Sequence, residues 1–224
     1  MENLISFSAK DLCSRSAMQI KMFREKPELK PKPTINQLNG ISYQDEVANR
    51  VKGFIGQEMR GTYIKDNICI NFSNDIVCED KIIEVKTVRE TDGLDWYFDN
   101  SILQTAAYKA LLENSNKKLV TSKFYFEKGN PYVEARVSEF DYFLLFGVDL
   151  YKIEVNDDKK IVDFLIRKAK ASLYWDTARD FDREFKKREF EVLKDAFSVE
   201  IVKNEINDIV LGLITYKMAH SKNG

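Results

Sequence analysis

One stretch, residues 75–88, constrains the fold of this chain more than any other. Its apolar residues lie on either side of a polar break at 78–81, and this pattern predicts two short strands joined by a tight turn. In the second strand Glu84 and Lys86 are two residues apart, so both side chains point to the same face of the sheet. The opposite face predicts packing against helices, because it carries Ile83, Val85 and Thr87.

Two charged side chains on such a strand need a physical reason, and a metal ion supplies one. Mg2+ takes oxygen ligands in near-octahedral geometry and keeps several waters. The carboxylates of Asp75 and Glu84 and the backbone carbonyl of Val85 provide three such oxygens. Lys86 beside them can orient or deprotonate a water, or neutralise charge that develops on a phosphate. The alternative is a solvent-facing strand edge, where Glu and Lys are ordinary residues that discourage edge pairing.

The context of this stretch favours the metal site. Asp75, eight residues, and then Glu84-Val85-Lys86 are similar to the D…ExK core of the PD-(D/E)XK nuclease superfamily. Residues 104–108 (QTAAY) resemble the QxxxY element of its RecB-like branch, which includes phage exonucleases and CRISPR-associated nucleases. Residues 40–47 (GISYQDEV) resemble the helix that carries an acidic or histidine metal ligand in that branch. Three elements in this order are more specific than ExK alone.

This resemblance implies both a fold and an activity. The fold is α/β (α+β), with a restriction-endonuclease-like core in which helices flank a central mixed β-sheet, and with a helical C-terminal extension. The activity is Mg2+- or Mn2+-dependent hydrolysis of DNA. Because members of this branch are commonly exonucleases, an exonuclease of recombination, repair or phage DNA metabolism is expected. In this mechanism Lys86 positions the attacking water.

The resemblance also implies roles for other residues. Gln104 and Tyr108, one turn apart on a helix, are expected to support substrate phosphates or to brace the catalytic strand. The helix that contains residues 40–47 is expected to supply Glu46 as a metal ligand, or Asp45 if the helix is rotated by one residue. The ordinary structural alternative is an ion pair of Glu46 with Arg50. The implied metal ligands are Glu46, Asp75, Glu84 and the carbonyl of Val85.

Residues 1–175 are predicted to form the nuclease domain, and 176–224 a helical extension that packs on the core or forms an interface. Within the first domain, residues 1–39 supply a helix and then a proline-rich strap. Asp99 or Asn100 is expected to cap a helix that ends near Leu112.

Hydrophobic spacing predicts two further helices, over 41–55 and 158–174. Asn71, Ser73 and Asn74 predict a turn between a strand at 68–72 and the strand that begins at Asp75.

Composition limits the remaining possibilities. The net charge of −1 gives no overall attraction to nucleic acid, so DNA, the expected partner, needs a local surface. Three cysteines without CxxC spacing predict neither disulfides nor the four-cysteine iron–sulfur cluster of some RecB-like relatives. No apolar run of membrane-spanning length and no secretory signal are found, so a cytoplasmic location without membrane partners is expected.

Two other hypotheses come from different classes of protein. The fold can be a catalytically silent module that binds nucleic acid or a protein partner. The chain can also be a structural partner that acts through its C-terminal helices, as a homo-oligomer or with a recombination or repair protein.

Overall fold

The computed structural model describes residues 4–32, 43–88, 94–121, 132–134, 140–185 and 188–202. Within these ranges nine strands form one sheet: β1 (Ile5–Ser8), β2 (Phe54–Lys65), β3 (Ile68–Cys78), β4 (Lys81–Lys86), β5 (Lys118–Thr121), β6 (Tyr132–Glu134), β7 (Asp141–Phe146), β8 (Asp149–Val155) and β9 (Phe197–Ile201). Their order is β6-β5-β2-β3-β4-β7-β8-β9, with β1 paired to β3. The β1–β3 and β4–β7 pairs are parallel and the others antiparallel, so the predicted central mixed sheet is confirmed.

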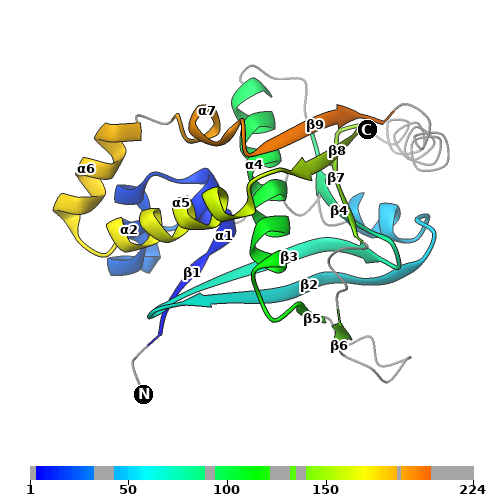
Figure 1. Cartoon of the computed structure of the whole chain (residues 1–224), viewed down its shortest axis with the longest axis horizontal. Helices are drawn as coiled ribbons and strands as arrows, with labels where there is room; N and C mark the ends of the chain where they lie inside the picture. Colours follow the sequence, from blue (N-terminus) through cyan, green and yellow to red (C-terminus); the bar gives the residue numbers. More distant parts are fainter. Residues whose placement is uncertain are drawn as a thin grey trace.

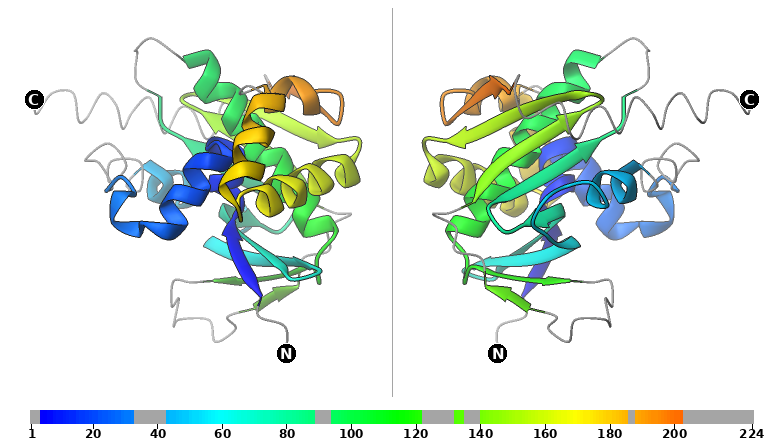
Figure 2. Two further views of the ribbon diagram at one scale, coloured as in Figure 1. Left: turned by 90° about the vertical axis from the view of Figure 1, so that its left-hand side faces the viewer. Right: turned by 90° about the vertical axis from the view of Figure 1, so that its right-hand side faces the viewer.

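Helices flank this sheet, as expected. They are α1 (Ala9–Ser14), α2 (Ala17–Glu25), the 3-10 helix η1 (Pro27–Leu29), α4 (Leu94–Glu113), α5 (Asp158–Ala171), α6 (Trp175–Phe185) and α7 (Glu189–Leu193). A further short helix covers residues 43–48. Helix α4 crosses the sheet at the centre of the molecule, and α2, α5 and α6 lie together at one end (Figures 1 and 2). Among the described segments, no helix combines the length and the apolar character that a membrane crossing requires.

The sheet has two apolar faces, because alternate residues of its strands point to opposite sides. On one face Ile82 of β4 and Leu144 of β7 belong to the core that includes Leu103 of α4. On the other face Ile83, Val85 and their neighbours pack with the helix of residues 43–48 through Val47. The alternation predicted for β4 is therefore confirmed, and it leaves Glu84 and Lys86 on the α4 face.

The predicted turn at Asn71–Asn74 is wrong, because β3 runs without interruption through it. Asn71 is paired with Thr62 of β2, and its side chain accepts a hydrogen bond from the Thr62 hydroxyl at 3.1 Å. The chain instead turns at Asp66, whose φ of 55° is left-handed. Polar residues at alternate positions of β3 thus line one side of a long strand, and they do not mark its end.

Three other boundaries differ from the predictions. The helix expected over 41–55 stops at residue 48 in the described chain, and Gly53 with a φ of 68° leads into β2. Helix α4 starts at Leu94, five residues before Asp99. Helix α5 confirms the prediction for 158–174 to within its last turn.

The C-terminal extension is only partly helical within the described residues. Helices α6 and α7 agree with the prediction, but residues 197–201 form β9, which pairs antiparallel with β8. Val199 and Ile201 are β-branched and favour a strand, and the buried Phe197 packs against the core. The apolar stretch predicted as a helix around 209–214 lies outside the described residues.

Candidate functional site

The site begins where β3 and β4 separate. Their backbone pairing is regular at Val77–Ile82 and Ile76–Ile83. Two residues beyond Ile83 the backbone N–H of Val85 donates to the Asp75 carboxylate, at 2.9 Å. Because the N–H and C=O of one residue in a strand point to the same neighbour, the Val85 carbonyl faces the same gap. The structure therefore places Asp75, Glu84 and the Val85 backbone together.

Glu84 lies at the centre of the site and is only 3% exposed. One of its carboxylate oxygens, Oε1, accepts hydrogen bonds from Lys86 Nζ and, at 2.6 Å, from Gln104 Nε2. Gln104 also donates to the hydroxyl oxygen of Tyr108, at 2.9 Å. The other oxygen of Glu84, Oε2, is buried and has no hydrogen-bond partner in the part of the chain that the structure describes. Four predicted residues therefore form one connected cluster.

The electrostatics of this cluster show a shortage of positive charge around Glu84. Burial, and then the negative charge of Asp75, raise the pKa of Glu84 to about 7, although Lys86 opposes the shift. Burial alone would lower the pKa of Lys86, but the charges of Glu84 and Asp75 outweigh burial and raise it. Lys86 is thus held as a cation, and one lysine does not neutralise two carboxylates.

The oxygens of Asp75, Glu84 and the Val85 carbonyl fit a hard divalent cation as ligands. Carboxylate and carbonyl oxygens are the ligands that Mg2+ and Mn2+ prefer, and a buried carboxylate oxygen without a partner is the kind of atom that such an ion satisfies. Across the described ranges no three His, Cys, Asp or Glu side chains converge on a common point. The side chains available here are therefore Asp75 and Glu84, and one or two carboxylates are the usual protein contribution to a Mg2+ site.

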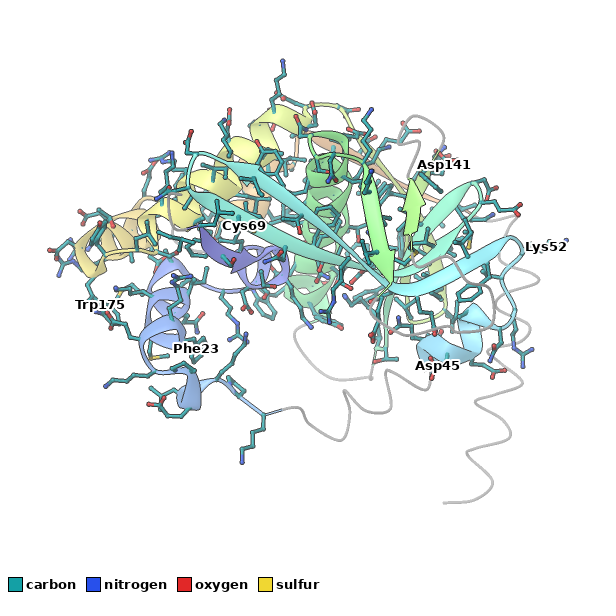
Figure 3. All side chains as sticks on the ribbon, turned by 90° about the horizontal axis from the view of Figure 1, so that it is seen from below. Phe23, Asp45, Lys52, Cys69, Asp141 and Trp175 are labelled. Atoms are coloured by element: carbon teal, nitrogen blue, oxygen red, sulfur yellow. The ribbon has the colours of Figure 1, made fainter. Side chains whose placement is uncertain are left out.

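The structure does not bring Glu46 to this cluster. Its carboxylate accepts hydrogen bonds from Arg50 one turn along the chain, as the structural alternative predicted. The Asp45 carboxylate accepts from the Gln57 amide at 3.0 Å. Both belong to the helix of residues 43–48, which packs on the face opposite α4, and Figure 3 shows Asp45 far from the end of the molecule that carries Phe23 and Trp175.

Gln44 is the residue of that helix that contacts the site. Its amide donates to the backbone carbonyl of Asp75 at 2.9 Å, and its side chain is buried. The helix therefore holds β3 in place by a contact with the backbone of Asp75.

The end of β4 is fixed by the turn that joins β7 to β8. Gly147 has a φ of 64°, a conformation that glycine adopts readily, and its N–H donates to the Lys86 carbonyl at 2.8 Å. The Tyr43 hydroxyl donates to the Gly147 carbonyl. The backbone of Lys86 is thus anchored on the β7 side of β4.

Two residues beside the cluster, Tyr97 and Lys10, are not predicted from the sequence. Tyr97 packs on Phe146, with ring centroids 5.4 Å apart. Its pKa is raised by burial and responds to the charges of Lys86, Glu84 and Asp75, so its hydroxyl lies near them.

Lys10 of α1 is the second of these residues. It is exposed, and its charge is a minor influence that lowers the pKa of Glu84. Helical spacing could have found Tyr97, since residues 97, 101, 104 and 108 share one face of a helix that starts before 97. Nothing in the sequence connects Lys10 to Glu84.

Comparisons with known proteins add little to this geometry. No family model matches the chain, and no curated protein matches it significantly. One solved structure, described as the crystal structure of SSO0001, is similar over 76% of this chain and 78% of its own, with a TM-score of 0.49 and 15% sequence identity.

Proposed function

We propose that the protein is a Mg2+- or Mn2+-dependent deoxyribonuclease. The observation that carries this proposal is the state of Glu84: a buried carboxylate with one oxygen held by Lys86 and Gln104, and the other left without a partner beside Asp75. A cluster of this kind is costly in a folded protein unless a ligand completes it, because a buried and unsatisfied charged group is destabilising.

Asp75, Glu84 and the Val85 carbonyl would hold the ion. When bound, it supplies Lewis acidity at a phosphodiester. Asp75 is already oriented by the Val85 N–H, and Glu84 by Gln104, so neither side chain needs to be ordered when the ion enters. This preorganisation supports binding of an ion at these two carboxylates.

Lys86 would act as a hydrogen-bond donor. Because its pKa is raised, it keeps its proton at neutral pH and donates to a water or to a phosphate oxygen instead of removing a proton. Negative charge develops on the phosphate during hydrolysis, and a fixed cation stabilises that charge most strongly in a site from which water is excluded.

Gln104 and Tyr108 would position Glu84. Gln104 is only 6% exposed, and its amide nitrogen donates to both Glu84 and Tyr108. Of the two roles predicted for this pair, bracing of the catalytic strand therefore has more support than contact with substrate phosphates. Phe72 stabilises the Tyr108 ring at a centroid distance of 6.0 Å, and Gly61 leaves room for Phe72, since a Cβ there would lie 2.2 Å from its ring.

The first test is cleavage of end-labelled linear and closed-circular DNA, single- and double-stranded, with Mg2+, Mn2+ or EDTA. We expect metal-dependent loss of linear DNA only, which defines an exonuclease. Nicking of circles would make the protein an endonuclease. Binding of DNA without any cleavage would contradict the proposal and favour the non-catalytic binding module.

The second test measures the ion directly. We expect Mn2+ to raise the thermal midpoint of the wild type, because a ligand that binds only the folded state stabilises it. The shift should disappear in Asp75→Asn and in Glu84→Gln. An equal shift in both variants would show that the ion binds elsewhere.

A further inference from the structure

A pocket of about 350 Å3 opens on the same side of the sheet as the cluster. Its walls come from three parts of the chain: the junction of α1 and α2, the first turns of α4, and α7. The residues that define it here are Ser14, Arg15, Gln19, Trp96, Asn100 and Glu189. Nothing in the proposed mechanism uses it.

The charges of this pocket do not suit a phosphate. Of its described lining residues two are charged, Arg15 and Glu189. Arg15 forms an ion pair with Asp11 at 2.8 Å, and Glu189 forms one at 3.0 Å with Lys168, which is 1% exposed. The pocket therefore offers no excess positive charge. Its other lining groups are hydroxyl, amide, thiol and indole, which suit a neutral ligand with polar edges.

Trp96 adds a preference for a planar ligand. Its side chain is 58% exposed although it belongs to a pocket wall, and an exposed indole is a stacking surface. Asn100, one turn further along α4, donates one amide hydrogen to the Trp96 carbonyl at 2.9 Å. Its side-chain carbonyl can still accept a hydrogen bond from a group stacked on the indole. Together these two residues match the face and the edge of a nucleobase.

Helix α4 connects the pocket to the cluster. Trp96 and Asn100 line the pocket, while Tyr97 and Gln104 of the same helix lie beside Glu84. Cys13 is also part of the pocket wall. Burial raises the pKa of its thiol, and the charges of Lys168, Glu189 and, more weakly, Glu84 all act on it. The pocket is therefore within electrostatic range of the proposed catalytic carboxylate.

We propose that this pocket binds one unpaired nucleobase of the DNA strand whose phosphate lies at Glu84 and Lys86. The base stacks on Trp96, and Asn100 contacts its edge. This inference rests on the proposed nuclease function and extends it, because a base can enter such a pocket only from single-stranded or frayed DNA.

The test uses Trp96 as its own reporter. The chain has two tryptophans, so Trp175→Phe leaves Trp96 as the only source of indole fluorescence. In this variant, with Lys86→Ala added to prevent cleavage, two end-labelled probes are compared: an oligomer of eight thymidylates, and an eight-residue abasic strand with the same phosphates. Binding is followed by anisotropy of the label and stacking by quenching of Trp96.

We expect the thymidylate oligomer to quench Trp96 and to bind more tightly than the abasic strand. Trp96→Ala should weaken binding of the thymidylate oligomer by about 5- to 150-fold, the equivalent of roughly 1–3 kcal/mol for one stacked base. It should leave binding of the abasic strand unchanged. Trp96→Phe keeps an aromatic face and should retain most of the affinity.

Two outcomes would overturn the inference, and they differ. Equal affinity for the two probes, without quenching, would remove the base pocket while DNA binding stands. Failure of both probes to bind, here and also to Trp175→Phe with Lys86 intact in EDTA, would remove the proposed nuclease function as well.

Discussion

The two faces of β4 carry different chemistry although the same six-residue strand builds both. On the α4 face Glu84 and Lys86 form a buried charged cluster with Gln104 and Tyr108. On the opposite face Ile83 and Val85 belong to an apolar core, and the acidic residues of the facing helix are engaged with Arg50 and Gln57. The carboxylates available to a cation are therefore those on the α4 face, Asp75 and Glu84.

The difference arises from burial. A carboxylate that forms an exposed ion pair keeps ordinary solvation and needs no ligand, whereas burial of Glu84 makes its charge costly. The α4 face therefore has a physical need for a cation that the helix of residues 43–48 lacks.

The largest expected effect is that of Lys86→Ala on DNA cleavage. Removal of the cation at the site should lower the turnover rate by roughly 100- to 1000-fold, as for the loss of one preorganised electrostatic donor. Steady-state cleavage at saturating Mn2+ measures it. Lys81→Ala, at the other end of the same strand, is the control and should cleave normally. Near-normal turnover in Lys86→Ala would rule out the mechanism proposed for this face.

The next largest effect is expected at Gln104, and Gln57, a buried glutamine on the opposite face, is its control. Gln104→Ala should lower the turnover rate by about 10- to 100-fold, as is usual when a residue that orients a metal ligand is lost. Gln57→Ala should mainly lower the free energy of unfolding, because Gln57 connects β2 to Asp45 and not to Glu84. Cleavage rates and denaturant midpoints of both variants separate these effects. A larger loss of turnover in Gln57→Ala would reverse the assignment of the faces.

The α4 face could largely be predicted from the sequence, because its geometry is local. Two-residue spacing on a strand and four-residue spacing on a helix fix which side chains share a face. Hence Glu84 with Lys86, and Gln104 with Tyr108, lie together as expected. Tyr97 escapes this prediction because the sequence places the N-cap of the helix at Asp99 or Asn100, after Tyr97.

The opposite face could not be predicted in the same way. The position of Glu46 depends on where its helix docks, and that is set by the apolar contacts of Val47 with β3 and β4 rather than by the acidic residues. Periodicity also extended this helix too far, since residues 51–55 have helical spacing but Phe54 pairs with Cys78 in the sheet. Strand β9 joins the far edge of the sheet, a long-range pairing that local patterns do not report.

The free energy of unfolding of the metal-free protein should depend on pH through the Glu84 carboxyl on the α4 face. The pKa of Glu84 is raised to about 7 from 4.5, so the folded state binds a proton that the unfolded state releases. The resulting stability is complete below about pH 4.5 and is lost as the pH rises through 7. Between pH 5 and pH 8 the free energy of unfolding should fall by about 2–3 kcal/mol, measured by denaturant titration in EDTA.

The two faces supply the controls for this measurement. Glu84→Gln should flatten the dependence, whereas Glu46→Gln should retain it. An unchanged slope in Glu84→Gln would show that another group titrates.

The smallest expected effect, that of Glu46→Gln on cleavage, tests the contrast most directly. The resemblance to RecB-like nucleases assigns Glu46 a metal-binding role, and loss of a metal ligand would cost orders of magnitude in rate. The structure instead shows the Glu46 carboxylate paired with Arg50, with 25% and 40% of the two side chains exposed. Such a pair contributes at most about 1 kcal/mol, so the turnover rate of Glu46→Gln should stay within about 5-fold of the wild type.

Asp45→Asn tests whether the other acidic residue of this helix, rather than Glu46, binds the ion. It removes the charge but keeps an oxygen that can accept from Gln57, so it too should cleave at a rate close to that of the wild type. A loss of 100-fold or more in either variant, with the Mn2+-induced thermal shift also lost, would mean that the helix moves toward Asp75 when the ion binds. Gln44 already touches the Asp75 backbone, so such a movement would begin from an existing contact, and the two faces would then act as one site.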